Sequence, residues 1–347
     1  MKPPSSQVEF ALGTVCTIRL YEGSDTRLYS RIFARLREID RTMTAFSGEA
    51  QDIMSGGAPV DPNSAAETLS SGVIAINRQA GREPVKVRAE LIELLEKAAH
   101  YAEVSDGAFD PTIGPLVQLW GIGTDAQRIP GNGEIAAALK LVNWRDLVID
   151  HQAGTAFLRR EGMALDLGAI AKGYAADEAL RIVRDAKIKR AIFDLGGNIA
   201  ALGWRMEAVR ARKKELLPWR IGIQNPLRER GTYIGVLLAH DTSVVTSGVY
   251  ERYFESGGRR YHHILSAVDG YPIDNGLLSV TIVTESSTAA DALATAVFAL
   301  GYARGKALID IIPGAEALFV FSDRSVRLTG GLAEIFTLSG NEFALIQ

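Results

Sequence analysis

The chain has 347 residues, of which 47% are hydrophobic and 23% are charged, a composition typical of globular proteins. Its net charge of −3 gives no electrostatic argument for nucleic-acid binding, and its single cysteine, Cys16, excludes an internal disulfide and a cysteine-based zinc site. No window is long and apolar enough for us to expect a membrane span, and the length indicates one large domain or two interleaved ones.

The first half of the chain alternates between extended and helical patterns. Residues 8–20 alternate like a strand, and apolar residues recur at helical spacing over Thr26–Thr42. Small and polar residues predict a loop or insertion over 47–72. We expect a second amphipathic helix over Leu91–Val104. The turn-rich segment that follows, residues 105–116, is unusually apolar for a turn and indicates a pocket wall.

The second half contains more strands than helices. Leu147–Ile149 and Thr155–Leu158 predict a hairpin, and residues 163–168 predict the end of a strand that runs into a helix over Ala169–Arg184. Residues 191–198 form an apolar strand followed by a glycine pair. Further elements are expected over Trp219–Asn225, Thr232–Ala239, Ser243–Val245, Leu278–Thr284 and Leu318–Phe321 as strands and over Thr288–Leu300 as a helix. Because the elements follow no regular βαβ rhythm, the pattern predicts an α+β fold rather than a doubly wound sheet.

The alanine-rich segment Thr288–Thr295 carries one carboxylate and one hydroxyl on the same helical face. Asp291 and Thr295 are four residues apart, which is one helical turn. A carboxylate in an apolar face is costly unless a positive group lies against it, and a carboxylate beside a hydroxyl suits a hard cation such as Mg²⁺. On these residues alone, the alternative is that Asp291 caps a helix and Thr295 bonds back to a carbonyl.

A second candidate is the segment Asp166–Tyr174, with the sequence DLGAIAKGY. Gly168 lets a ligand approach the main chain, and the helix that follows presents free N–H groups suited to phosphate. Lys172 adds a positive charge. The segment is neither a Walker loop nor a Gly-x-Gly-x-x-Gly motif. An ordinary helix start with a surface lysine is the alternative interpretation.

Three weaker signals accompany these two. Asp194–Asn198 is a glycine-rich turn beside an acid, or simply a tight turn between strands, and Thr246–Gly248 follows a strand with hydroxyls that could hold phosphate or ribose. Alternation allows only one of His262 and His263 to point into a cleft, and a lone histidine is often structural. Taken together, the signals outline a metal-assisted phosphate site.

In this combination and order, the motifs resemble the ApbE family, the FAD:protein FMN transferases, from Leu12 to about Gly301. The matching blocks are Leu12–Thr14, Ser105–Pro111, Asp166–Tyr174, Asp194–Asn198, Thr246–Gly248, His263–Leu265 with Gly270–Pro272, and Ala289–Thr295. The resemblance implies a T-fold-like α+β architecture that binds FAD between two interleaved lobes. It also implies one catalytic domain over residues 8–340.

The resemblance also implies a site. Mg²⁺ would be held by the side chains of Asp291 and Thr295 and by the carbonyl of Ala169. The binding site for FAD, the substrate, would be lined by Leu12, Phe46, Ala108, Phe109, Asp110, Asp166, Lys172 and Leu265, with Thr246 as a further candidate. Phe46 stands where family members often carry tyrosine, so that an aromatic ring for stacking is kept.

The implied reaction is attack of a Ser or Thr hydroxyl of an acceptor flavoprotein on the FMN phosphorus, with release of AMP. His263 or a nearby carboxylate would act as the base, and Asp291 would serve through the metal. Attack by water would instead make the chain an FAD pyrophosphatase. A flavin-binding carrier without catalysis is the third possibility.

Two departures from the family pattern stand out. The family usually reads His-Ile-Ile-Asp-Pro-x-Thr-Gly, whereas this chain has Ser266 at the aspartate and Ala267 at the proline, with Asp269 nearby. The segment from Ser47 to Ser71 is also longer than usual, which would gate the site or alter acceptor docking.

The family implies a periplasmic protein with a lipid anchor in the inner membrane and an acceptor such as a subunit of a membrane redox complex. Residues 1–7 lack the apolar core of a signal peptide. We therefore expect this segment to be disordered or derived from a replaced leader, with a true cytoplasmic start as the alternative.

Overall fold

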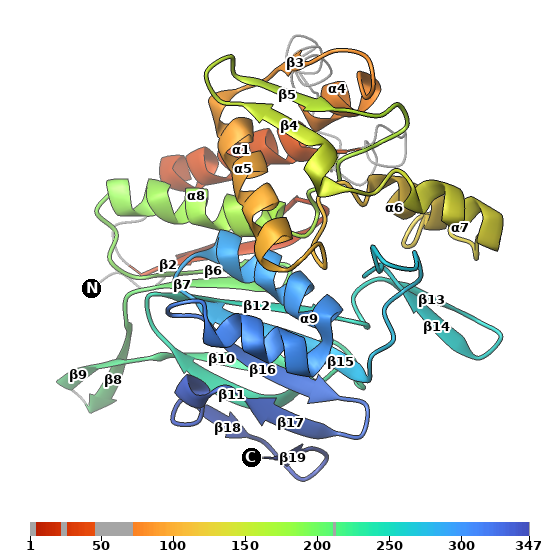
Figure 1. Cartoon of the computed structure of the whole chain (residues 1–347). Helices are drawn as coiled ribbons and strands as arrows, with labels where there is room; N and C mark the ends of the chain where they lie inside the picture. Colours follow the sequence, from red (N-terminus) through yellow and green to blue (C-terminus); the bar gives the residue numbers. More distant parts are fainter. Residues whose placement is uncertain (1–4, 22–25, 46–71, 211–212, 347) are drawn as a thin grey trace.

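The computed structural model describes residues 5–21, 26–45, 72–210 and 213–346 (Figure 1). Its centre is a nine-stranded sheet with the order β1-β2-β6-β7-β12-β15-β16-β17-β19, in which β17 and β19 are parallel and the other neighbours antiparallel. The strands span Ser5–Ala11, Thr14–Leu20, Ala191–Leu195, Asn198–Leu202, Thr242–Gly248, Leu277–Thr284, Glu316–Phe321, Ser325–Leu328 and Ala344–Leu345, in that order.

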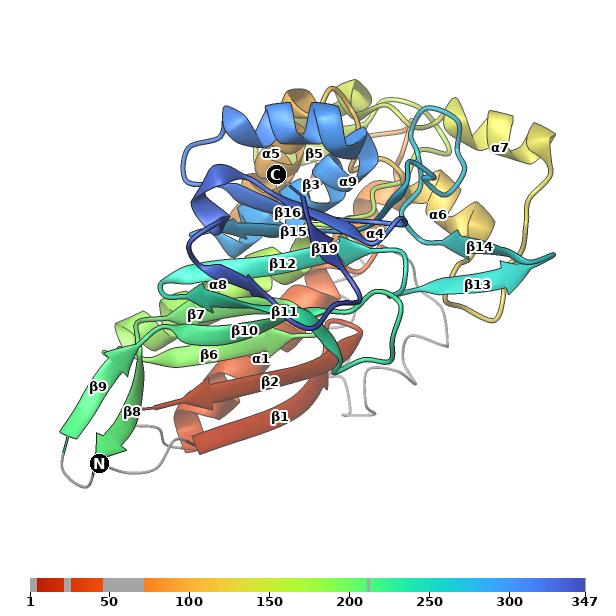
Figure 2. The same cartoon turned by 90° about the horizontal axis from the view of Figure 1, so that it is seen from below.

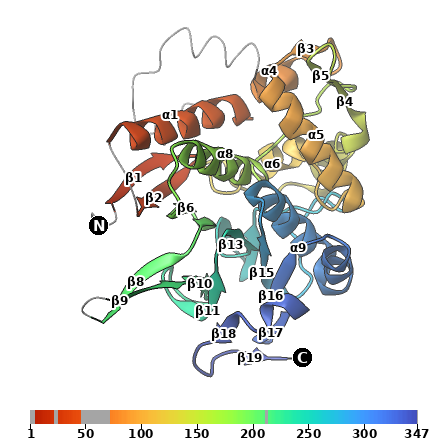
Figure 3. The same cartoon turned by 90° about the vertical axis from the view of Figure 1, so that its left-hand side faces the viewer.

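Helices cover one face of this sheet and a second sheet covers part of the other (Figures 1 and 3). The main core lies between the large sheet and helices α1, α5, α8 and α9, and a second core lies between the large sheet and the three-stranded sheet β10-β11-β18. The helices span Thr26–Met43, Ala89–Val104, Ala171–Asp185 and Ser287–Asp310, and the three strands span Trp219–Gln224, Tyr233–Ala239 and Phe336–Leu338.

Smaller elements surround these layers. Helices α6 and α7 share a third small core with the β13–β14 hairpin, and the β8–β9 and β13–β14 hairpins extend from opposite ends of the molecule (Figure 2). These elements and the rest are α4 (Val73–Arg78), β3 (Val85–Lys86), α6 (Gly114–Trp120), α7 (Asn132–Leu139), β4 (Leu147–Asp150), β5 (Thr155–Leu158), β8 (Arg205–Arg210), β9 (Lys213–Leu217), β13 (Tyr253–Ser256), β14 (Arg259–His262) and two 3₁₀ turns (Trp144–Asp146 and Gly330–Leu332).

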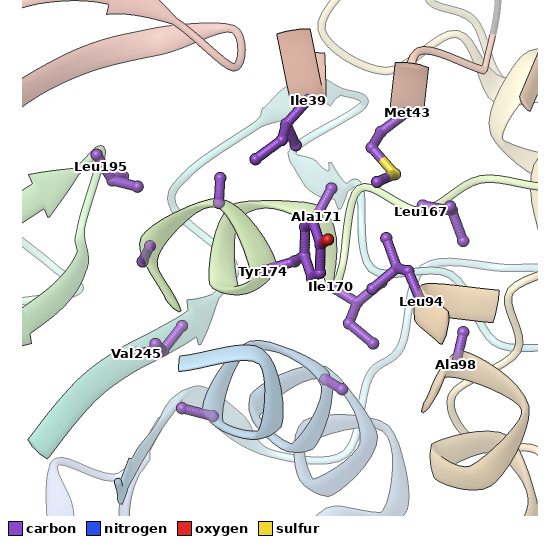
Figure 4. Packing of buried hydrophobic residues seen from close by; sticks show 14 of the residues in the cluster. Ile39, Met43, Leu94, Ala98, Leu167, Ile170, Ala171, Tyr174, Leu195 and Val245 are labelled. Carbon is purple, nitrogen blue, oxygen red and sulfur yellow. The ribbon is translucent and has the colours of Figure 1, made fainter. Parts of the chain in front are cut away.

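The start of α8 is anchored deep in the main core (Figure 4). Ile170, Ala171 and Tyr174 are all buried there, among side chains of α1, α5 and β12. Apolar burial of this kind contributes about 1.5–3 kcal/mol for each large side chain. The loop that precedes α8, together with the first turn of the helix, is therefore held in one place relative to the sheet.

Several sequence predictions are confirmed and others are wrong in detail. The predicted strand over residues 8–20 is a hairpin, because Leu12 and Gly13 adopt positive φ angles of 55° and 68° and turn the chain back. Residues 5–7, expected to lie outside the fold, belong to β1. No strand forms over 163–168, where Ala164 makes only an isolated bridge. The predicted loop over 47–72 lies almost wholly outside the described residues.

Helix α9 contradicts the expectation that no segment is apolar enough to span a membrane. It has 24 residues, and an 18-residue window reaches a mean hydropathy of 1.2. In the structure, however, 56% of that window is buried inside the protein, where the helix packs on the large sheet and on α8. Helix α9 is therefore buried like a helix in the core of a folded domain. Its backbone kinks at Gly301, where φ is 74°.

Cys16 is fully buried in β2, and burial raises the pKa of its thiol to about 12. The reactive thiolate is therefore scarce at pH 8. We expect no modification of the folded protein by a thiol reagent at this pH and rapid modification after unfolding in denaturant. Fast labelling of the native protein would contradict this expectation.

Candidate active site

Helices α8 and α9 approach each other closely at Gly173. A Cβ atom built on Gly173 would lie 2.2 Å from the Ser287 carbonyl oxygen and 2.8 Å from the Asp291 Cβ, so that no larger residue fits without moving a helix. The Gly173 N–H donates a 2.8 Å hydrogen bond to Asp291 Oδ2. The glycine therefore brings a buried carboxylate of α9 against the backbone of the first turn of α8.

Ala169 lies just before α8, whose N-cap is Ile170. Gly173 is the third residue of the helix, and the N–H groups of the first turn of a helix have no partner within the helix. Here the N–H goes to Asp291 instead, and none of the described residues donates a hydrogen bond to the Ala169 carbonyl oxygen. Among the described residues, the Ala169 carbonyl is thus left without a hydrogen-bond donor just before the first turn of α8, the turn whose Gly173 N–H binds Asp291.

Asp177, which the sequence analysis did not single out, fixes the start of α9 against α8. Its carboxylate accepts hydrogen bonds from the backbone N–H groups of Ser287 and Thr288 (2.8 and 2.9 Å) and from the hydroxyls of Ser286 and Thr288 (3.0 and 2.6 Å). These groups include N–H donors at the end of a helix that have no intrahelical partner. The Ser-Ser-Thr run before the alanine-rich helix was the available signal for a cap, but the acid that it meets is 109 residues away along the chain.

Lys172 provides the positive charge that the buried carboxylate requires. Its Nζ lies 3.9 Å from Asp291 Oδ1 and donates a 3.0 Å hydrogen bond to the Gly168 carbonyl. Burial raises the pKa of Asp291, and Lys172 opposes that rise. The carboxyl of Asp166 is in a similar environment. Burial raises its pKa, whereas the hydrogen bond from the Gly168 N–H (2.8 Å) and the positive charges of Arg252 and Lys172 lower it.

Strand β12 contributes a hydroxyl, but a different one from that predicted. The Thr246–Gly248 motif lies inside β12 rather than after a strand. Ser247 Oγ is 3.2 Å from Thr295 Oγ1, on the face that carries the helices. Thr246 points to the opposite face, where its Oγ1 lies 2.8 Å from Thr281 Oγ1. The hydroxyl that joins the Asp291–Thr295 pair is therefore that of Ser247.

The two adjacent histidines have separate roles. His262 is buried and its Nε2 lies 2.8 Å from the Ile273 carbonyl, so it holds two loops together. His263 is half-buried, with Nδ1 3.2 Å from the Arg252 carbonyl. A carbonyl only accepts, so we assign the Nδ1 proton to this contact, which leaves Nε2 as an acceptor. Burial, with Arg252 close by, lowers the pKa of His263 to about 3, and the ring is neutral at pH 7.

The predicted pocket wall is partly a structural support. Asp110 accepts hydrogen bonds from the N–H and hydroxyl of Thr112 (2.8 and 2.7 Å) and from the Trp144 N–H (3.0 Å), so its carboxylate is engaged in holding two loops. Phe109 is 3% exposed in the main core, while Ala108 beside it is half-buried. Their predicted contacts with FAD stay predictions.

The remaining predicted lining residues are dispersed around the loops. Leu12 lies in the β1–β2 turn, with its N–H bound to Asp40 Oδ2 at 2.9 Å. Leu265 is 8% exposed, against the small core of α6 and α7. Phe46 lies outside the described residues.

The chemistry of these residues fits a magnesium ion. A carboxylate, a hydroxyl and an unpaired carbonyl are all oxygen donors, which Mg²⁺ prefers, and a magnesium site commonly uses only one or two carboxylates. Over the described ranges, no group of three or more His, Cys, Asp or Glu side chains is placed to hold a metal. A hard-cation site with one acid at the α8–α9 junction is therefore consistent with the structure.

A family model described as the ApbE family matches residues 12–319. The chain belongs to the ApbE family. Proteins named FAD:protein FMN transferase are similar over nearly the whole chain: that of Treponema pallidum is 39% identical, covering 98% of this chain and 91% of the relative, and one of Klebsiella pneumoniae is 35% identical, covering 92% and 89%.

Solved ApbE structures share the architecture. The ApbE protein of Thermotoga maritima superposes with a TM-score of 0.79 at 31% identity, covering 96% of this chain and 99% of that protein. The flavin transferase ApbE of Vibrio cholerae gives a TM-score of 0.75 at 25% identity, with 96% of each chain covered. The predicted family and α+β fold class are thus confirmed.

The structure explains how this ApbE-family chain accommodates Ser266 in place of the usual aspartate. Ser266 Oγ accepts hydrogen bonds from the N–H groups of Val268 and Asp269 (3.1 and 3.2 Å), as a short acidic side chain does at the start of a turn. The Gly270 N–H closes the turn on the Ser266 carbonyl at 2.9 Å. The Ser266 hydroxyl therefore supplies the acceptor that this turn needs, although it carries no charge.

Proposed function

We propose that this chain transfers FMN from FAD to a serine or threonine hydroxyl of an acceptor protein and releases AMP, in a reaction that requires Mg²⁺. The observation that carries the proposal is the α8–α9 junction, where the buried Asp291 carboxylate lies 3.9 Å from Lys172 and accepts a hydrogen bond from the Gly173 N–H. In the proposed site, Thr295 and the Ala169 carbonyl add two further oxygen ligands. The similarity over nearly the whole chain to proteins named FAD:protein FMN transferase supports the same activity.

The proposed reaction is a single displacement at phosphorus. The acceptor oxygen forms a bond to the FMN phosphorus, the anhydride bond to AMP breaks, and the hydroxyl proton passes to a base. When bound, Mg²⁺ supplies positive charge to the pyrophosphate and to the departing AMP. Lys172 adds a second positive charge, and the fixed position of the first turn of α8 orients it before substrate arrives.

His263 is the proposed base. Its ring is neutral in the free protein, and its Nε2 is available as an acceptor once Nδ1 is bound to the Arg252 carbonyl. Its low pKa means that the free protein holds a proton poorly, but negative phosphate charge nearby raises the pKa of an imidazole. We therefore expect His263 to become an effective base only when FAD is bound.

A pH titration tests this assignment. An ordinary histidine takes up a proton near pH 6.5. Because the pKa of His263 lies below that value, its neutral ring signals in the ¹⁵N-correlated NMR spectrum should persist unchanged from pH 8 down to about pH 5. The signals that disappear in a His263→Gln variant identify the residue. A midpoint for His263 near pH 6.5 in the free protein would contradict the prediction.

Incubation with FAD tests the proposed activity against hydrolysis and against simple flavin binding. We expect AMP release only when Mg²⁺ and an acceptor carrying the Ser/Thr target are both present, with flavin retained on the denatured acceptor. AMP release without acceptor, with no flavin on the acceptor, would identify a pyrophosphatase. Intact FAD after long incubation would identify a binding protein.

We also propose that the acceptor is an exported flavoprotein, such as a subunit of a membrane redox complex, and that the native protein is periplasmic and lipid-anchored. The support is the family resemblance. Fractionation of cells that make the native protein should recover it with the inner membrane, and recovery in the cytoplasm would contradict the proposal.

A further inference from the structure

Arg252 lies in the segment between β12 and β13, and its main chain is attached to His263. The Arg252 carbonyl accepts a hydrogen bond from the His263 N–H at 3.1 Å and lies 3.2 Å from His263 Nδ1. These two contacts fix the backbone of Arg252 beside the proposed base. The start of the Arg252 side chain is therefore anchored next to His263.

The Arg252 side chain extends between two glycine turns. A Cβ atom built on Gly123, in the loop after α6, would lie 3.5 Å from Arg252 Cδ. One built on Gly13, in the β1–β2 turn, would lie 3.6 Å from Arg252 Nη2. The guanidinium group thus lies against the Leu12–Gly13 turn, which belongs to the first of the blocks that match the ApbE family.

Within the described part of the chain, the Arg252 guanidinium forms no ion pair. Among the described residues, no carboxylate oxygen lies within 4.0 Å of its guanidinium nitrogens, and the side chain is exposed. The neighbouring carboxylate, Glu251, is paired instead with Arg230 at 3.2 Å. Arg252 is nevertheless close enough to lower the pKa of both Asp166 and His263. Its positive charge therefore acts on the groups that surround the proposed reaction centre.

The charges of this region are balanced by the proposed substrate and metal. Lys172 and Arg252 offset Asp166 and Asp291 when both carboxylates are ionised. A magnesium ion then brings two positive charges, which the two negative charges of a pyrophosphate offset. A planar guanidinium group forms two parallel hydrogen bonds to phosphate oxygens, which Lys172 cannot do.

We propose that Arg252 binds the pyrophosphate of FAD from the side of the β1–β2 turn. This proposal rests on the proposed function, because it takes FAD as the ligand. It adds a substrate-binding residue that lies on neither helix of the α8–α9 junction. It also gives the Leu12–Gly13 turn a role, since a side chain at Gly13 would narrow the space that the guanidinium occupies.

Binding of FAD to variant proteins tests the proposal without any requirement for turnover. Arg252→Ala should weaken FAD binding by about 10- to 100-fold, measured by calorimetry in the presence of Mg²⁺, because a charged hydrogen-bonding group is lost. Arg252→Lys should bind FAD with an affinity between those of the unaltered protein and Arg252→Ala, since lysine keeps the charge but cannot form two parallel hydrogen bonds. The matched control is Arg259→Ala, which removes an exposed arginine from the adjacent hairpin and should stay within about twofold of the unaltered protein.

The outcomes separate this proposal from the one on which it rests. FAD affinity of Arg252→Ala within about threefold of the unaltered protein would overturn the role of Arg252, and so would an equal loss in Arg259→Ala. An increase in the KM for the acceptor with unchanged FAD affinity would assign Arg252 to acceptor binding and also overturn it. Failure of the unaltered protein to bind FAD would instead refute the proposed function. Because the Arg252 side chain is exposed, the thermal unfolding midpoint of the Arg252→Ala variant should equal that of the unaltered protein.

Discussion

Replacing Asp291 with alanine should abolish metal-dependent turnover while FAD still binds. The variant removes the one carboxylate of the proposed Mg²⁺ site. A metal supplies several kcal/mol of charge stabilisation in phosphoryl chemistry, and each 1.4 kcal/mol is a factor of about ten in rate. We therefore expect kcat to fall by at least about 1000-fold, measured as AMP release in the presence of acceptor, FAD and Mg²⁺.

The matched control for this variant lies on the same helix. Asp310→Ala removes an exposed carboxylate that is paired with Lys306 at the C-terminal end of α9, and it should leave kcat unchanged. Circular dichroism of both variants checks that α9 still forms. Unchanged turnover in Asp291→Ala, with an intact fold, would refute the metal assignment.

Replacing Gly173 with alanine should separate α8 from α9. The added methyl group would lie 2.2 Å from the Ser287 carbonyl oxygen and 2.8 Å from the Asp291 Cβ, so at least one helix must move. Overpacking of this kind typically costs about 1–3 kcal/mol of unfolding free energy. Movement of α9 also takes the Asp291 carboxylate away from the Gly173 N–H and the first turn of α8. We therefore expect a lower denaturation midpoint and at least about tenfold weaker Mg²⁺ binding.

Gly133 in α7 provides the comparison, because a Cβ atom built there meets no atom within 4 Å. Gly133→Ala should stabilise the protein by up to about 1 kcal/mol, since alanine is the better helix former, and should leave Mg²⁺ binding unchanged. If Gly173→Ala behaved like Gly133→Ala in both measurements, the close contact between α8 and α9 would not be what positions the carboxylate.

The parts of the site that could be predicted are those encoded over one or two helical turns. Asp291 and Thr295 share a face because of helical periodicity, and Lys172 follows Gly168 at the start of a helix for the same local reason. The structure places Lys172 beside Asp291. The resemblance to the ApbE family supplied Ala169, whose main-chain oxygen has no signature in side-chain types.

The parts that could not be predicted depend on how distant elements pack. The Gly173 N–H, which has no partner within α8, donates to the Asp291 carboxylate in a contact across 118 residues. Asp177 caps a helix that begins more than 100 residues later, and Ser247 meets Thr295 only after β12 packs under α9. In each case the sequence shows the residue type but not the partner.

The strand predictions failed where periodicity alone was ambiguous. Residues 8–20 alternate throughout, and the hairpin turn is marked only by Gly13, since Leu12 is an unusual residue at positive φ. Likewise, β12 continues through Thr246–Gly248, although the small and hydroxyl residues there predicted a segment that follows the strand. Register decides which hydroxyl faces the helices, and a shift of one residue moves it to the other face of the sheet.

An anomalous-diffraction experiment tests most directly whether a cation binds where α8 meets α9. Crystals soaked with Mn²⁺ and AMP would reveal the ion, because manganese scatters anomalously and accepts similar oxygen ligands. We predict an anomalous peak for one Mn²⁺ ion that lies about 2.0–2.3 Å from oxygen atoms of the Asp291 carboxylate, the Thr295 hydroxyl and the Ala169 carbonyl. An ion bound elsewhere, with none of these three oxygens as a ligand, would contradict a cation site at this junction.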